Sequence, residues 1–72
     1  MNERDKLRFR LKTNHLTHAW LINQLEKQGI EIDAPTLSGA LSGVRKGPSI
    51  DRVFDESKEI LDRYEHLMSD FA

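Results

Sequence analysis

The stretch Asp33-Ala-Pro-Thr-Leu-Ser-Gly-Ala-Leu-Ser-Gly-Val-Arg-Lys-Gly-Pro48 decides how this chain folds. It opens with Asp33, whose carboxylate can cap a helix, and with Pro35, which suits a first helical turn because no backbone N–H is needed there. It closes with Gly47-Pro48, a pair that stops helices. Apolar side chains recur between these ends at helical spacing, at Leu37, Ala40, Leu41 and Val44. The stretch therefore predicts a short helix that ends at about residue 46.

The opposite face of this helix has almost no bulk. Its outward residues are small and polar at first and basic at the end: Thr36, Ser38, Gly39, Ser42, Arg45 and Lys46. Because small side chains let another surface approach closely, this face is predicted to bind a large partner.

A second short helix is expected before it, from Thr17, a good capping residue, to about residue 28, just before Gly29. Trp20, the single tryptophan, either anchors the core or lies half exposed at its rim. Two short helices with a tight joint predict a helix-turn-helix over about residues 17–46, with Ile30 or Ile32 buried beneath the joint. The inward positions of the first of these helices are predicted to be Ala19, Leu21, Ile22 and Leu25.

The N-terminal residues 2–13 carry two competing patterns. Leu7, Phe9 and Leu11 alternate with basic residues, which is typical of a half-buried strand, whereas Leu7 and Leu11 alone form an i,i+4 helical pair. Glu3 and Asp5 would lie in the first turn of such a helix, where carboxylates suit the helix dipole. No other run resembles a partner strand, so a helix is predicted.

A final helix is predicted after Ser49, its expected cap. It is either one long amphipathic helix or two helices hinged around residues 55–58. Its apolar stripe covers the core, or it continues as the seam of a homodimer through Val53, Ser57, Ile60, Tyr64, Leu67 and Phe71.

Length and composition limit the fold and the location. Seventy-two residues make one domain, residues 1–72, and without cysteine its stability must come from helix packing. No apolar run is long enough for a membrane span, so a cytoplasmic protein is expected. The predicted fold is an all-α, compact helix-turn-helix domain of four to five helices, with a long C-terminal amphipathic helix.

The charge is balanced overall but unevenly distributed. Eleven basic and twelve acidic residues give a net charge of −1, whereas a domain that binds nucleic acid alone is usually distinctly basic. Basic residues predominate in residues 1–12 and acidic residues in 51–70.

Catalytic and metal chemistry is not indicated. His15 and His18 lie three residues apart, but no third ligand follows in a metal-binding spacing. The serines lie in no nucleophile motif, and Ser38 to Gly43 does not have the spacing of a phosphate-binding loop. We expect neither an enzyme nor a bound cofactor.

Two runs resemble the Cro/phage-repressor class of helix-turn-helix proteins: Leu16-Thr-His-Ala-Trp-Leu-Ile-Asn-Gln-Leu25 and Leu37-Ser-Gly-Ala-Leu-Ser-Gly-Val-Arg-Lys-Gly-Pro48. At this length and with its acidic C-terminal part, the whole chain resembles the short modulator-of-repression, or antirepressor, proteins of temperate phages of Gram-positive bacteria. The resemblance implies a regulator of a lysis–lysogeny switch that works in the host cytosol beside a repressor.

The departures from that class concern the residues that would contact DNA. His18 occupies the place where the class often has Gln, and it remains a possible phosphate contact. The first turn of the recognition helix offers Thr36 and Ser38 instead of side chains that make bidentate contacts to bases. Glu31 and Asp33 would stand where a DNA phosphate often lies.

Three functions follow from these observations. The favoured one is binding of a partner repressor's DNA-binding domain through the acidic joint and the small-residue face. The second is direct operator binding, with that face against the bases and the two basic residues at its end on phosphate. The third is a purely structural dimerising module that uses the last helix.

Overall fold

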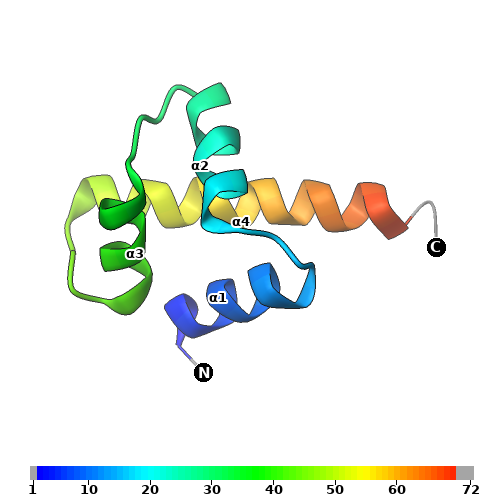
Figure 1. Ribbon diagram of the computed structural model, residues 1–72, viewed down its shortest axis with the longest axis horizontal. Helices are drawn as coiled ribbons and strands as arrows, with labels where there is room; N and C mark the ends of the chain where they lie inside the picture. The colour runs from blue at the N-terminus through cyan, green and yellow to red at the C-terminus, as the bar shows by residue number, and fades with distance from the viewer. Residues whose placement is uncertain (1, 70–72) are drawn as a thin grey trace.

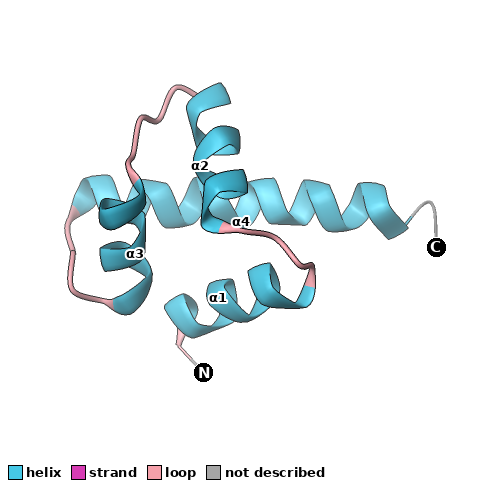
Figure 2. Cartoon of the chain, in the orientation of Figure 1, coloured by secondary structure: helices cyan, strands magenta, loops and turns pink. Residues whose placement is uncertain are grey.

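The computed structural model describes residues 2–69 and contains four α-helices and no strand within that range. They are α1 (Glu3–Thr13), α2 (His18–Lys27), α3 (Ala34–Ser42) and α4 (Pro48–Ser69). α4 runs along the long axis of the molecule, and the three shorter helices pack beside it (Figures 1 and 2). α1 and α2 each contact both α3 and α4. The prediction of a compact all-α fold is confirmed.

Residues 3–13 form the helix α1, although the alternation of Leu7, Phe9 and Leu11 with basic residues is also typical of a strand. The Asn2 side chain caps it by accepting a hydrogen bond of 2.8 Å from the Asp5 backbone N–H. Leu7 and Leu11 are both buried, whereas Phe9 is 58% exposed because it points away from them around the helix. The i,i+4 pair, not the alternation, therefore decided the structure.

α2 begins at the predicted cap. The Thr17 hydroxyl accepts a hydrogen bond of 3.1 Å from the Trp20 backbone N–H. Leu21 and Leu25 are fully buried. Ala19 is exposed, so its predicted inward position was wrong: it precedes Leu21 by two residues, about 200° around a helix.

α3 starts as predicted and ends earlier than predicted. Asp33 caps its N-terminus, but the helix stops at Ser42 because Gly43 adopts a left-handed conformation with φ of 86°. The backbone N–H of Val44 then donates to the Gly39 carbonyl at 2.9 Å. Val44 is 82% exposed, and the predictions that it faces the core and that the helix reaches residue 46 were both wrong.

α4 starts one residue before its predicted cap. The Gly47 carbonyl accepts the first helical hydrogen bond, from the Asp51 N–H at 2.9 Å, and Pro48 occupies the first helical position. Ser49 therefore lies inside the helix, and its predicted capping role was wrong. The helix continues without a break through residues 55–58 to Ser69. Phe71, the last residue of the predicted dimer seam, lies outside the described residues.

The core joins all four helices and the α2–α3 connection. Its buried apolar residues are Leu7, Leu11, Leu21, Leu25, Ile30, Leu37, Ala40, Leu41, Val53, Ile60 and Leu61. Trp20 lies at the rim, partly buried and edge-on to the Tyr64 ring with 5.3 Å between ring centroids. Ser57 is fully buried, and its hydroxyl has no hydrogen-bond partner among the described residues.

Ion pairs between oppositely charged side chains join α1 to α4. Arg10 donates to Asp62 at 2.7 Å and to Glu65 at 2.8 Å, and Lys58 pairs with Glu3 at 2.7 Å. The pKa of Glu65 is lowered, first by the hydrogen bond from Arg10 and then by one from Asn14. The basic first helix and the acidic last helix therefore neutralise each other along this contact.

Candidate partner-binding surface

The site predicted from the sequence lies on α3 and the connection before it. We call it the α3 face and define it by Glu31, Asp33, Pro35, Thr36, Ser38, Gly39 and Ser42. Of these residues, Thr36 and Gly39 are partly buried and the others are exposed. These residues lie on the α2–α3 connection and on the outward side of α3, and each of them is at least partly exposed.

Asp33 has a structural role on this face. Its carboxylate accepts a hydrogen bond of 2.8 Å from the Thr36 backbone N–H, which fixes the first turn of α3. Hydrogen bonding from Thr36 is the main cause of a lowered pKa for Asp33, and the nearby positive charge of Arg45 lowers it further. The carboxylate therefore carries its negative charge throughout the neutral pH range.

Arg45 reaches the α3 face from the loop after the helix. Because the chain turns at Gly43, Arg45 folds back over Gly39: a Cβ added to Gly39 would lie 3.1 Å from its Cγ and Cδ atoms. The Arg45 N–H also donates to the Gly39 carbonyl at 3.1 Å. The missing side chain at Gly39 thus accommodates the stem of Arg45, a role that the sequence did not reveal.

One hydroxyl group of the α3 face is already engaged within the protein. The Ser42 hydroxyl donates to the Gly39 carbonyl at 3.1 Å, whereas Thr36 bonds Asp33 through its backbone N–H. A hydroxyl that donates internally has no proton left to offer a base edge. Among the polar side chains of this face, Ser38 is exposed and forms no internal hydrogen bond within residues 2–69.

A hollow of about 380 Å³ lies beside the acidic connection. It is bounded by the α2–α3 connection, the first turn of α3 and the first turns of α4, with both carbon and polar atoms on its walls. Its lining residues are Gly29, Ile30, Glu31, Ile32, Thr36, Ser49, Ile50, Arg52 and Val53. A side chain with an apolar stem and a positive end fits such a place next to the Glu31 carboxylate.

Arg4 is a residue of this region that sequence reasoning missed. A Cβ added to Gly43 would lie 2.9 Å from Arg4 Nε, so the Arg4 guanidinium rests against the turn that ends α3. A cation is favourable there because the C-terminal end of a helix carries partial negative charge. The sequence shows an excess of basic residues in α1, but only the packing selects which of them meets α3.

Two other predicted site residues lie apart from Gly39. Lys46 is exposed in the loop between α3 and α4, so it is not part of a helical face. His18 is exposed at the start of α2 and lines a separate hollow between α1 and α2, together with Arg8 and Lys12. None of the other predicted site residues lines that hollow.

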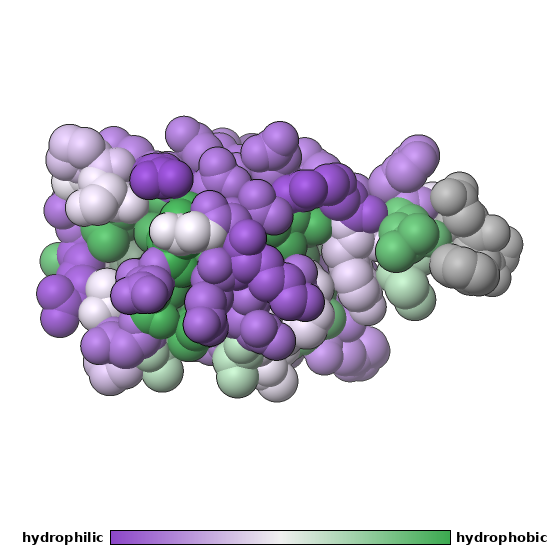
Figure 3. Space-filling model, turned by 90° about the horizontal axis from the view of Figure 1, so that it is seen from above, coloured by the Kyte–Doolittle hydropathy of each residue, from purple (hydrophilic) through white to green (hydrophobic). Residues whose placement is uncertain are grey.

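Large hydrophobic side chains are exposed at Phe9, Val44, Leu67 and Met68 among the described residues. Figure 3 shows one face that is mostly hydrophilic, with hydrophobic side chains in its gaps and beside the grey C-terminal residues. Leu67 and Met68, in the last turns of α4, are 57% and 47% exposed. No helix in residues 2–69 combines the length and apolar character that a membrane span requires. Nor do three His, Asp or Glu side chains of that range gather where a metal could bind.

Comparisons with known proteins assign no family to this chain. The sequence matches no protein-family model and no curated protein, and the fold matches no solved structure.

Proposed function

We propose that this protein is a phage-type transcriptional regulator of a lysis–lysogeny switch that binds the DNA-binding domain of a partner repressor. In this proposal α2 and α3 form a helix-turn-helix of the Cro/phage-repressor class, and the long amphipathic α4 supports it from behind. The α3 face is the binding surface. The protein acts in the cytoplasm of the host bacterium.

The observation that carries this proposal is the chemistry of the α3 face. A recognition helix that reads DNA needs Arg, Lys, Asn or Gln aimed at base edges. Here the Ser42 hydroxyl donates to the Gly39 carbonyl, and Gly39 is covered by the stem of Arg45, which comes from the loop after the helix. α3 itself contains no Arg, Lys, Asn or Gln that could distinguish one base pair from another.

Charge complementarity supports a protein partner. The DNA-reading surface of a repressor must be basic to bind phosphate. Glu31 and the ionised Asp33 stand exposed at the N-terminal edge of the α3 face, where they can pair with such a surface. The hollow beside Glu31 gives room for the stem of a partner's arginine or lysine.

Direct operator binding is the competing function, and one observation favours it. Arg45 and Lys46 are both exposed near the C-terminal end of α3, within reach of a phosphate backbone if α3 lay in a major groove. The net charge of −1 counts against this function, because a domain that binds DNA alone is usually distinctly basic. We expect only weak, non-selective binding to DNA, with a Kd of about 10⁻⁴–10⁻⁶ M or weaker at physiological salt.

A three-way binding experiment tests the proposal. Labelled duplex DNA from a switch region is titrated with the purified protein, with the partner repressor, and with the two together. We expect the protein alone to shift the DNA weakly and to remove the repressor from it. Tight, sequence-selective binding by the protein alone would overturn the proposal and establish operator binding.

The Asp33→Asn variant tests the electrostatic part. Asn retains the capping ability of Asp and removes its charge, so the fold is kept. The repressor complex should weaken more at about 50 mM salt than at about 500 mM salt, because salt already screens exposed pairs at the higher concentration. Glu59→Gln, which removes one negative charge at an exposed position of α4, serves as the matched control.

A further inference from the structure

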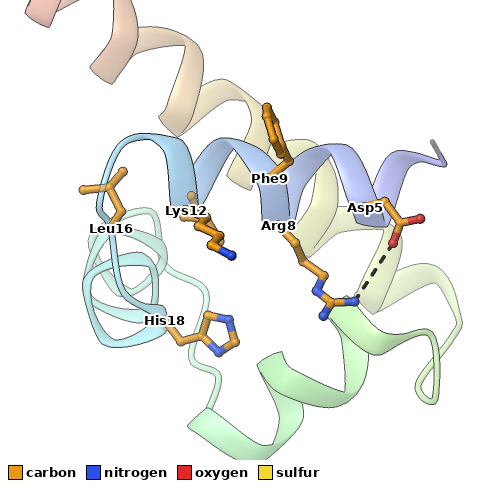
Figure 4. A pocket seen from close by; sticks show the side chains of 7 residues that line it. Asp5, Arg8, Phe9, Lys12, Leu16 and His18 are labelled. Carbon is orange, nitrogen blue, oxygen red and sulfur yellow. Dashed lines mark ion pairs between the residues drawn. The ribbon is translucent and has the colours of Figure 1, made fainter.

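The hollow between α1 and the start of α2 is a second concave surface. It measures about 500 Å³ and is lined by Asp5, Arg8, Phe9, Leu11, Lys12, Leu16 and His18. Figure 4 shows Lys12 and His18 extending toward the same space from α1 and α2, Arg8 extending beside it toward Asp5, and the side chains of Phe9 and Leu16 pointing away from it. Its volume is in the range of about 300–1,000 Å³ that binding sites occupy.

The basic side chains of this hollow have fewer carboxylate partners than the basic side chain of α1 that faces α4. On the α4 side of α1, Arg10 is paired with two carboxylates. On the side of the hollow, within residues 2–69, Arg8 meets one carboxylate, that of Asp5, at the long distance of 4.0 Å, and Lys12 meets none. The fold thus leaves an excess of positive charge at this place on a chain whose net charge is −1.

The rim of the hollow is apolar. Phe9 is 58% exposed on α1, although a polar residue there would leave the core unchanged. Leu16 packs partly against the core and also lines the hollow. The phosphate backbone of a duplex offers no apolar group to an exposed phenyl ring, whereas the Asp5 carboxylate would repel any anion alike. A protein segment that carries both carboxylates and apolar side chains satisfies the two parts of the site together.

We propose that this hollow binds an acidic, amphipathic segment of a partner protein, with its carboxylates on Arg8, Lys12 and His18 and an apolar side chain against Phe9. The site is distinct from the α3 face in residues and in charge, and it does not rest on the function proposed above. Arg8 can hold a carboxylate through two parallel hydrogen bonds, which gives such a contact direction as well as strength.

Fluorescence anisotropy with a defined probe tests the site. The probe is a labelled peptide of about 15 residues, four helical turns, with Glu and Asp on one face and Leu and Phe on the other. Two control peptides replace either the acids by Gln or the apolar residues by Ser. We expect the full-length protein to bind the probe and both control peptides to bind at least about tenfold more weakly, since each lacks one half of the contact.

Protein variants locate the contact. The double variant Arg8→Gln/Lys12→Gln should weaken probe binding by about tenfold or more, and Phe9→Ser should weaken it without changing its salt dependence. The matched control is Lys27→Gln/Arg63→Gln, which removes the same charge at two exposed positions elsewhere. Circular dichroism confirms that each variant is folded.

Three outcomes would overturn the proposal. One is that the probe fails to bind at about 1 mM, the limit of weak specific affinity. Another is that the matched control variant loses as much affinity as Arg8→Gln/Lys12→Gln, which would show non-specific charge attraction. The third is that labelled duplex DNA binds more tightly than the peptide and depends on Arg8 and Lys12, which would assign the hollow to nucleic acid.

Discussion

Leu37→Ala and Val44→Ala are a matched pair of substitutions within the stretch that decides the fold. Both residues occupy apolar positions with helical spacing, but Leu37 is fully buried whereas Val44 is 82% exposed beyond the end of α3. Removing the three outer carbons of Leu37 forfeits about 2.4 kcal/mol of transfer free energy. The cavity left behind raises the cost, and buried Leu→Ala changes commonly cost about 2–5 kcal/mol. Val44→Ala should change stability by no more than about 0.5 kcal/mol.

Urea denaturation followed by circular dichroism measures both variants. A 72-residue domain has a free energy of unfolding of about 4–11 kcal/mol, so Leu37→Ala removes a large share of it. If Leu37→Ala is too unstable for a complete curve, Leu37→Val, which removes one carbon, should still fold and lose about 1 kcal/mol. Equal unfolding midpoints for Leu37→Ala and Val44→Ala would refute the placement of α3 and its early end at Gly43.

Three further changes test individual parts of the fold. Ser57→Ala removes a fully buried hydroxyl without a partner in the described residues, so the free energy of unfolding should rise by about 1 kcal/mol in a urea titration; a loss of stability would show that the hydroxyl is satisfied. Gly43→Ala should destabilise by about 1–2 kcal/mol, because φ is 86° there and the new Cβ would meet Arg4; unchanged stability would contradict the left-handed turn. The folded-state pKa values of Glu3 and Glu65 are lowered, so their contribution is present above their ordinary value of 4.5 and is lost as the pH falls through the folded values. Thermal unfolding from pH 7 to pH 2 should show this loss, and a Glu65→Gln variant should lose less stability over the same range than the native chain.

The starts of α2 and α3 were predictable because capping is local. Asp33 and Thr17 each accept a hydrogen bond from the backbone N–H three residues later, an arrangement that needs only the right side chain at the right position. Leu7 and Leu11 were likewise predictable from their i,i+4 spacing. These features depend on neighbours within one helical turn.

The end of α3 was not predictable in the same way. Two glycines, Gly43 and Gly47, could each stop the helix, and the apolar Val44 between them favoured the later one. The structure turns at Gly43, where Arg4 from α1 packs against the turn. A contact with a different helix cannot be seen from local spacing.

The same limit applied to the candidate surface. The helical spacing correctly placed Ser38, Gly39 and Ser42 on the outer side of α3, but it put Arg45 at the helix end as a free phosphate contact. In the structure the chain reverses at Gly43 and brings Arg45 back over Gly39. The ion pairs of Arg10 with α4 could not be predicted either. The sequence shows that basic residues predominate at one end and acidic residues at the other, but not which of them form pairs.

The most direct test of the proposed function is the affinity of Gly39→Arg for the DNA-binding domain of the partner repressor. Arg45 already lies over Gly39, so an arginine at this helical position displaces that flexible side chain and adds a second bulky cation to the centre of the α3 face, with no clash against the backbone. Arg45→Ala is the control for the displacement, because it removes the side chain that covers Gly39 and adds no bulk. We predict that Gly39→Arg abolishes the complex, that Arg45→Ala retains it, and that both keep the native circular-dichroism signal. Native affinity in Gly39→Arg would contradict the account, since the partner would then bind elsewhere on the molecule.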